Sequence, residues 1–257
     1  MSNNDSVKKT LIVALSLCVV CSVVVSTAAV VLKPLQQANV QEDRKRNILA
    51  AAGMLRDDIS INEQFADIQA RAVDLDSGTF SDAVDAEKFD PIAAARDPDS
   101  SIKLEKSDDS ANIGGRREEY GIVYLVGDVQ NPDRIIMPIR GAGLWGQLYG
   151  FLALEGDGET IAGIGFYEHK ETPGLGGEVD NPRWKGQWPG KLAYRDGKVG
   201  INIVKGTADR TGPNASYEID GLSGATLTTR GVDNLVHFWL GDKGFGPFLV
   251  NLKAGEA

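Results

Sequence analysis

Hydroxyl side chains gather in the stretch Asp220-Gly-Leu-Ser-Gly-Ala-Thr226, which runs directly into residues 227–240. Apolar residues recur in that segment at three- and four-residue steps, which predicts a helix with one buried face, and Gly241 stands where a left-handed cap is expected. The free N–H groups and the positive dipole at the start of a helix attract phosphate. Thr228 or Thr229 is expected to cap the start of this helix. The loop therefore predicts a phosphate contact, with a tight turn and helix cap as the alternative.

A second glycine-containing loop, Glu171-Thr-Pro-Gly-Leu-Gly176, follows an expected strand. Its glycines would let the backbone approach a flat ring, and Leu175 could lie on the face of that ring. The loop does not match the dinucleotide-binding fingerprint, because Val179 stands where a third Gly would be expected. An ordinary surface turn is the alternative for this loop taken alone.

Aromatic and imidazole side chains near these loops are further candidates for contact with a bound cofactor. Trp145 could pack against a bound ring, with a core position as the alternative, whereas Trp184 and Trp188 are assigned to packing. For His169 we favour a surface position over contact with a cofactor. His237 is expected to be an ordinary, partly buried helix residue.

The Asp220–Thr226 stretch resembles the flavinylation motif of FMN-binding domains: Asp, two residues, Ser or Thr, Gly, Ala and Thr. In that family FMN is joined through its phosphate to the last Thr. The resemblance implies covalent FMN on Thr226, with Asp220, Ser223, Gly224 and Ala225 as the other motif residues. Asp220 is expected to orient the loop, or to contact the modifying enzyme and its metal, rather than to touch the phosphate.

The Glu171–Gly176 stretch resembles a second hallmark of the same family. This resemblance implies that Glu171, Thr172, Leu175 and Gly176 contribute to the FMN site, and Trp145 joins them as a candidate ring contact. No residue of this chain is expected to be catalytic by itself.

The composition excludes several classes of function. Lys and Arg number 27 against 36 Asp and Glu, giving a net charge of -9, and no basic stripe suggests nucleic-acid binding. Only two His and two Cys are present, too few for a zinc or iron–sulfur site within the chain. At 257 residues the chain can form one good-sized domain with an appendage.

Residues 11–32 form a run of apolar and small residues without charge, Pro or Gly. As a helix, this run can cross the roughly 30 Å hydrocarbon core of a bilayer. A cleaved signal peptide is the alternative, with Ser26-Thr-Ala28 as its cleavage site, but such peptides carry only about 7–15 apolar residues. We therefore expect an uncleaved anchor, although basic residues on both sides leave its orientation open.

Cys18 and Cys21 have the C-x-x-C spacing of redox and metal sites, but they lie inside this apolar run. Packing on a membrane helix is the favoured role, because cysteine behaves there as a small apolar residue. A redox or metal role is the alternative.

The segment after the anchor is expected to be partly helical. Residues 34–58 are predicted to be helical, since 37–55 lack Pro. A second helix begins at Ser60, with Glu63 completing a capping box and Phe65, Ile68 and Val73 along its face. Residues 76–115 are expected to be irregular, with one short helix at 91–95 and a strand at 102–106.

From Tyr120 onwards the pattern changes to apolar runs separated by turns. These runs predict strands at 121–126, 134–139, 148–154, 161–167 and 199–205. Gly-Asp-Gly at 156–158 predicts a hairpin, and Asp196-Gly197 a turn.

The predicted fold class is α+β: a single N-terminal transmembrane helix followed by a soluble FMN-binding domain with an antiparallel sheet and flanking helices. The expected division is a cytoplasmic start at 1–10, a transmembrane helix at 11–32, a helical and irregular extension at 33–115, and the FMN-binding domain at 116–257.

The whole chain, with its anchor, extension and both motifs, resembles the family of C subunits of bacterial Na+-translocating NADH:quinone reductases. The resemblance implies a single-pass protein of the bacterial inner membrane, with its soluble domain in the periplasm and FMN attached by a flavin transferase that uses FAD. It implies an electron relay between an iron–sulfur centre and the FMN of the B subunit, during quinone reduction coupled to Na+ export. The implied partners are the other members of a complex of six subunits, notably the B, D and E subunits, and the chain alone would not be a complete enzyme.

Two alternatives remain at this point. The G subunit of an Rnf-type electron transport complex shares the anchor and the motif, but the long 34–115 extension favours the reductase family. A membrane-anchored assembly module would leave Thr226 unmodified.

Overall fold

The computed structural model describes residues 7–257, and its contacts divide the chain into two compact units, residues 1–44 and 45–257. Helix α1 (Val7–Ala51) begins in the first unit and ends in the second. Within the described part of the chain, α1 is the one helix long and apolar enough to cross a membrane. Of the start expected at 1–10, residues 1–6 lie outside the described residues.

The apolar run expected to be helical at 11–32 and most of the helical segment expected at 34–58 lie in one continuous helix of 45 residues, which ends earlier than expected. Pro34 lies inside it, where it removes one backbone N–H donor without ending the helix. The helix ends at Ala51, and Gly53 then adopts a left-handed φ of 65°. The Met54 N–H closes this turn on the Leu49 carbonyl at 2.8 Å.

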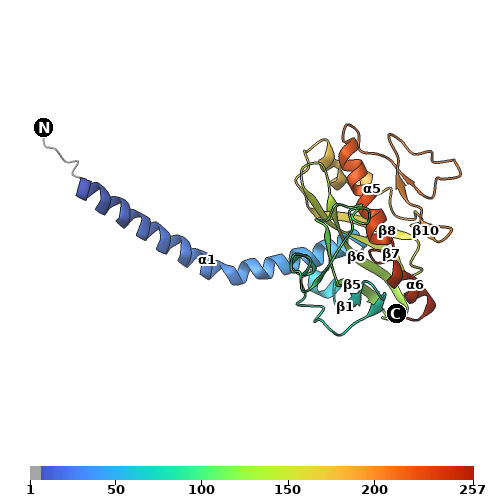
Figure 1. Ribbon diagram of the computed structural model, residues 1–257, viewed down its shortest axis with the longest axis horizontal. Coiled ribbons are helices and arrows are strands. Elements are labelled where there is room, and N and C mark those ends of the chain that lie inside the picture. Colours follow the sequence, from blue (N-terminus) through green and yellow to red (C-terminus); the bar gives the residue numbers. More distant parts are fainter. Residues whose placement is uncertain (1–6) are drawn as a thin grey trace. The chain divides into compact units, whose positions relative to one another are not determined.

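The second unit is built on an antiparallel six-stranded sheet of order β2-β1-β5-β6-β7-β8, and Figure 1 shows β5 to β8 side by side. Its strands are β1 (Ile68–Asp74), β2 (Thr79–Phe80), β5 (Tyr120–Gly127), β6 (Pro132–Ala142), β7 (Gln147–Glu155) and β8 (Ile161–Glu168). The four expected strands from 121 to 167, and the hairpin at 156–158 between β7 and β8, are confirmed.

Each face of the sheet carries a hydrophobic core, as the alternation along β5 shows. Val123 and Leu125 join the core shared with the C-terminal helices. Ile122 and Tyr124 join the core formed with Ile48 and its neighbours at the end of α1. Successive side chains of a strand point to opposite faces, so a strand buried on both faces is apolar along its whole length.

The second helix expected from Ser60 is only one turn, α2 (Ile61–Gln64), although Ser60 does accept the Glu63 N–H as its cap. The longer helix was wrong, because the chain becomes β1 and pairs with β5 from Ile68 to Asp74. Part of the 33–115 extension therefore belongs to the same sheet as β5 to β8.

Short elements complete the unit. Before β5 they are α3 (Pro91–Arg96), β3 (Ser101–Lys103) and β4 (Arg116–Glu118). After β8 they are η1 (Gly176–Asp180), α4 (Pro182–Lys185), β9 (Tyr194–Arg195), β10 (Lys198–Val199), β11 (Asn202–Ile203), β12 (Glu218–Ile219), α5 (Thr226–Leu240) and α6 (Gly246–Ala254).

The single strand expected at 199–205 is divided between β10 and β11, because its pairing partner changes. Val199 pairs with Tyr194 across the expected turn at Asp196-Gly197, whose two residues have φ of 51° and 75°. Asn202 instead pairs in parallel with Glu218 of β12.

Helix α5 packs directly on the backbone of β6. A Cβ on Gly231 would collide with the Ala142 carbonyl, and one on Gly141 would collide with Leu235, so both glycines permit the close approach. The Trp239 indole N–H donates to the Arg140 carbonyl at 2.7 Å. These contacts fix the start of α5 beside the loop that follows β6.

The C-terminal end of α5 differs from the expected left-handed cap. Gly241 has φ -87° and ψ -174°, an extended conformation, because the chain turns at once toward α6 and Gly246 donates to the Gly241 carbonyl. The Tyr194 hydroxyl donates to the Leu240 carbonyl at 2.8 Å, and burial raises the pKa of Tyr194 well above its ordinary value.

A buried ion pair beneath α5 generates a stability prediction. The Arg140 guanidinium donates to both Glu118 carboxylate oxygens, at 2.6 and 2.5 Å, with side-chain exposures of 9% and 2%. Glu118→Ala should lower the free energy of unfolding by about 3–5 kcal/mol, because it leaves a buried guanidinium uncompensated. Urea denaturation of the full chain in detergent would measure this loss.

Glu155→Ala is the matched control, since Glu155 pairs with Arg134 at 3.2 Å on a partly exposed surface. It should cost less than about 1 kcal/mol. Equal losses for the two variants would contradict a structural role for the buried pair.

Candidate functional site

Three segments far apart in the sequence meet at the buried carboxylate of Glu171. Its Oε1 accepts the backbone N–H groups of Leu144 and Trp145, at 2.9 and 3.0 Å, and its Oε2 accepts the Thr228 hydroxyl at 2.5 Å. Only 6% of Glu171 is exposed. The carboxylate therefore ties the loop between β6 and β7, the loop after β8 and the first turn of α5 together.

Two glycines leave room for this carboxylate. A Cβ on Gly143 would come within 2.5 Å of Glu171 Oε1, and one on Gly176 would collide with Oε2 and approach the Thr228 hydroxyl to 2.6 Å. Gly176 is buried and therefore serves the packing of the loop itself. The Gly174 φ of 77° is the loop's left-handed position.

His169 is hydrogen-bonded to the Glu171–Gly176 loop and to Asp180. Its Nδ1 accepts the Glu171 N–H at 3.1 Å, which leaves the proton on Nε2 to be donated to Asp180 at 2.8 Å. The His169 side chain is only 15% exposed, so the favoured surface position was wrong. Two hydrogen bonds to neighbouring residues hold the ring against the protein.

The three threonines at the start of α5 are in different environments. Thr226 is the first helical residue and is exposed, and its hydroxyl makes no hydrogen bond within residues 7–257. Thr228 is fully buried against Glu171. The Thr229 hydroxyl donates to the Ala225 carbonyl and accepts the Leu222 N–H, both at 3.0 Å.

Neither Thr228 nor Thr229 caps the helix, contrary to the expectation, because their hydroxyls are drawn to Glu171 and to the preceding turn. The N-cap residue is Ala225, which has no side chain that could cap the helix. The first N–H groups of α5 thus lack a side-chain cap, as an anion-binding helix start requires.

The turn before Thr226 is shaped by its glycine and by the neighbouring loop. Gly224 has φ of 73°, and a Cβ there would stand 3.0 Å from Leu175 Cδ2. Ser223 is exposed and Ala225 is buried. The motif and the Glu171–Gly176 loop are therefore neighbours in space.

Both carboxylate oxygens of Asp220 already have partners in the neighbouring loop. Its Oδ1 accepts the Ala208 N–H at 2.8 Å, and its Oδ2 pairs with Arg210 at 2.8 Å. These contacts place Asp220 in a loop-orienting position, with its carboxylate turned to residues 208–210.

Large apolar side chains are exposed around the site. We define the apolar rim as Leu144, Trp145, Leu175 and Leu227, which are 45%, 64%, 45% and 55% exposed. Within the described chain beyond α1, the other exposed large hydrophobic residues are Tyr167 and Val250. An apolar surface gathered in this way fits a flat, largely apolar ligand.

The remaining candidates have supporting positions. The Thr172 carbonyl accepts the Leu175 and Gly177 N–H groups, at 3.1 and 2.9 Å, and so closes the loop. Trp184 and Trp188 are buried in the core, which confirms their assignment to packing. His237 is partly buried and hydrogen-bonded to the Ile201 carbonyl, as expected of an ordinary helix residue.

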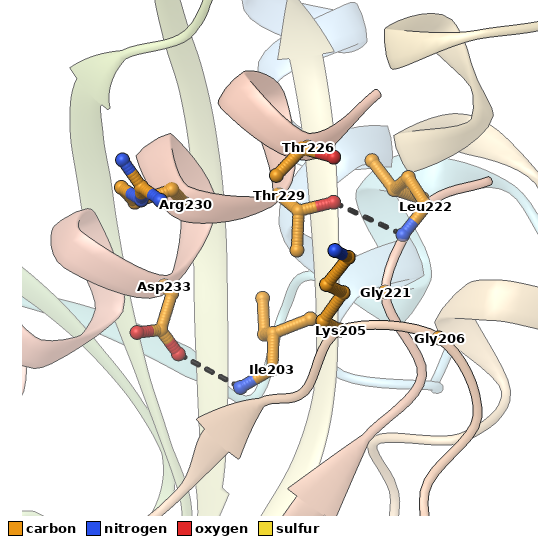
Figure 2. Close-up of a pocket in the computed structure, with 9 residues that line it drawn as sticks. All are labelled: Ile203, Lys205, Gly206, Gly221, Leu222, Thr226, Thr229, Arg230 and Asp233. Carbon is orange, nitrogen blue, oxygen red and sulfur yellow. Dashed lines mark hydrogen bonds between the residues drawn. The ribbon is translucent and has the colours of Figure 1, made fainter. Parts of the chain in front are cut away.

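Sequence reasoning missed two basic residues beside Thr226. Lys205 and Arg230 line a pocket of about 230 Å³ together with Thr226, as Figure 2 shows. Arg230 follows Thr226 by four residues, a helical spacing that could have placed both on one face. Lys205 follows a two-residue strand and has no comparable local signal.

Among the described residues, the Thr226 hydroxyl has no hydrogen-bonded base beside it. A hydroxyl nucleophile ordinarily needs an adjacent proton acceptor, and Thr226 contacts none within the described residues. For the exposed Thr226 hydroxyl to react as a nucleophile, a base would have to be supplied from outside residues 7–257.

The chain is similar to a known domain family and to known full-length proteins. Residues 143–241, which contain both loops and α5, match the model of the FMN-binding domain. The chain is 53% identical over its whole length to the C subunit of the Na(+)-translocating NADH-quinone reductase of Pseudomonas aeruginosa, and covers all of that protein. It is 46% identical to the corresponding protein of Vibrio alginolyticus, with 99% and 98% of the two chains covered.

Two solved structures share the fold. The crystal structure of Shewanella oneidensis NqrC is 33% identical, with a TM-score of 0.75 over 84% of this chain and 99% of that one. The C subunit of the Na(+)-translocating NADH-quinone reductase of Parabacteroides distasonis is 26% identical, with a TM-score of 0.66 over 85% and 96% of the two chains. An apolar N-terminal helix followed by an antiparallel-sheet domain with helices is therefore confirmed as the fold.

The junction at Glu171 generates a prediction for this site. Glu171→Ala should leave the Leu144 and Trp145 N–H groups and the Thr228 hydroxyl without their acceptor. Hydrogen exchange of the Leu144 and Trp145 amides should accelerate about tenfold or more, because hydrogen bonds to charged groups contribute about 1.5–3 kcal/mol each. Amide exchange read by mass spectrometry or NMR would measure the change.

Glu168→Ala, at the exposed end of β8, is the control and should leave these amides unchanged. Unaltered exchange in Glu171→Ala would mean that the junction does not hold the loop.

Proposed function

The chain belongs to the family of C subunits of Na(+)-translocating NADH-quinone reductases, and we propose that it relays electrons through FMN attached covalently to Thr226. The single observation that carries the attachment site is the state of the three hydroxyls. Thr226 is exposed and its hydroxyl makes no hydrogen bond within the described residues, whereas Thr228 and Thr229 are buried and hydrogen-bonded.

The residues present fit FMN in both its charged and its apolar parts. The uncapped start of α5 and the neighbouring basic pocket suit the phosphate. The apolar rim suits the ring, with Trp145 and Leu175 as its proposed contacts. Glu171, Thr172 and Gly176 would shape this site from within the loop, and Ser223, Gly224 and Ala225 would set the turn that presents Thr226.

Attachment would proceed by transfer from FAD, catalysed by a separate flavin transferase. A bond forms between Thr226 Oγ1 and the phosphorus of the FMN half, and the pyrophosphate bond to the AMP half breaks. AMP leaves, and the hydroxyl proton passes to a base of the transferase, since Thr226 has no such partner among the described residues.

Bound FMN supplies reversible one- and two-electron chemistry. The contribution of this chain is to hold the cofactor permanently and to keep it near the surface, beside exposed side chains of the apolar rim. We propose that electrons pass between an iron–sulfur centre of the neighbouring D and E subunits, which lie in the membrane, and the FMN of the B subunit. Quinone reduction and Na+ export would occur elsewhere in this complex of six subunits.

Helix α1 supports a membrane anchor by its length and composition. We propose that it stays uncleaved in the bacterial inner membrane and that the sheet domain lies in the periplasm. The orientation rests on the family resemblance, because the flanking charges favour neither side.

The attachment site can be tested with three isosteric substitutions made in the presence of the flavin transferase. Thr226→Val should abolish in-gel flavin fluorescence after denaturation, because no oxygen remains to be esterified. Thr228→Val and Thr229→Val should keep their fluorescence despite some loss of stability, and Thr226→Ser should retain at least part of it.

A fluorescent Thr226→Val band beside a dark Thr228→Val band would show that another threonine is the acceptor. Dark bands for every form, the parent included, would favour the unmodified assembly module.

The topology can be tested by adding protease to intact spheroplasts. Residues beyond 40 should be digested, because the proposed orientation exposes the sheet domain outside the cytoplasm. Inverted vesicles are the control, and digestion restricted to them would overturn the orientation.

A further inference from the structure

The pocket beside Thr226 is positively charged in a chain whose net charge is -9. Lys205 and Arg230 line it and are exposed, and the side chain of neither has an ion-pair or hydrogen-bond partner within residues 7–257. The one carboxylate of the pocket, Asp233, already accepts the Ile203 N–H at 2.8 Å. In Figure 2 the Lys205 side chain extends from its loop toward Thr229 and the first turn of α5. Two cations are thus available to a ligand.

The Lys205 loop is fixed beside the Asp220–Thr226 motif by a series of backbone contacts. The Val204 N–H donates to the Ile219 carbonyl at 2.9 Å, and the Gly221 N–H donates to the Gly206 carbonyl at 2.8 Å. A Cβ on Gly221 would collide with the Val204 carbonyl, so the glycine of the motif permits this approach.

Asp220 holds the far side of the same loop through the Ala208 N–H. Two residues of the motif, Asp220 and Gly221, therefore position Lys205 next to Thr226. A loop anchored on both sides of its lysine places that charge reproducibly, in contrast to a lysine on a free loop.

We propose that this pocket binds the phosphodiester that joins FMN to Thr226, with Lys205 and Arg230 as its counter-charges. The proposal rests on the proposed function, since it concerns the same linkage. A phosphodiester keeps one negative charge and unesterified oxygens that accept hydrogen bonds. Arginine and lysine are the side chains that recognise such groups, arginine by paired N–H donors and lysine as a point charge.

Phosphorus NMR of the flavinylated full chain in detergent tests this assignment through the access of cations to the phosphodiester. Mn2+ added at low concentration relaxes a phosphorus nucleus that it can approach. In the parent protein, Lys205 and Arg230 should repel Mn2+ from the phosphodiester, so that its phosphorus nucleus relaxes slowly. In Lys205→Gln or Arg230→Gln, the relaxation should increase about threefold to tenfold, because removing one nearby charge changes the local divalent cation concentration by that order.

Lys198→Gln and Arg183→Gln are matched controls, since both residues are exposed and neither lines the pocket. They should leave the relaxation as in the parent. In-gel flavin fluorescence would bring all samples to equal flavin content before the comparison.

The outcomes separate this inference from the proposed function. A parent protein without a phosphodiester resonance would overturn covalent attachment, and this inference with it. A parent resonance that Mn2+ relaxes as strongly as in both pocket variants would overturn the pocket assignment and leave the attachment intact. An equal increase in the control variants would also overturn it, because the effect would then follow net charge alone.

Discussion

The buried carboxylate of Glu171 is the interaction on which the rest of the site depends. A carboxylate with 6% of its residue exposed is stable only if its oxygens are satisfied, and two backbone N–H groups and the Thr228 hydroxyl do so. These donors come from separate segments, so satisfying the charge also fixes the geometry between them. The missing side chains of Gly143 and Gly176 follow from the same constraint, because the carboxylate occupies their space.

The three threonine hydroxyls at the start of α5 differ in their hydrogen bonding. Thr228 and Thr229 hold their hydroxyls in hydrogen bonds, whereas the Thr226 hydroxyl makes none within residues 7–257 and is the acceptor under the proposed function. The Thr226 hydroxyl lies between two kinds of surface. One is the apolar rim, and the other is the basic pocket lined by Lys205. A ligand that is both anionic and aromatic matches this combination better than a purely polar or purely apolar one.

The sheet was largely predictable from the sequence, whereas the connections within the site were not. Strand β5 is apolar along its length, and this pattern indicates that both faces of the strand are buried. Strand β1 contains Ala and Arg, which favour helices, and its conformation is decided by pairing with β5, whose paired residues follow 46 to 58 positions later. Similarly, the motif pointed to Thr226, but no local pattern could show that Glu171 would bind Thr228 or that Lys205 would lie beside them.

The burial of Thr228 and Thr229 has a consequence for the fidelity of maturation. An unfolded chain would offer a modifying enzyme three chemically equivalent threonines within four residues, whereas the folded chain offers one. With Thr226 as the proposed acceptor, selectivity among the three would follow from tertiary structure and would need no recognition of each neighbouring residue. Folding would act as a proofreading step, because a chain that failed to bring Glu171 to α5 would present the wrong hydroxyls and lose the ordered turn that presents the right one.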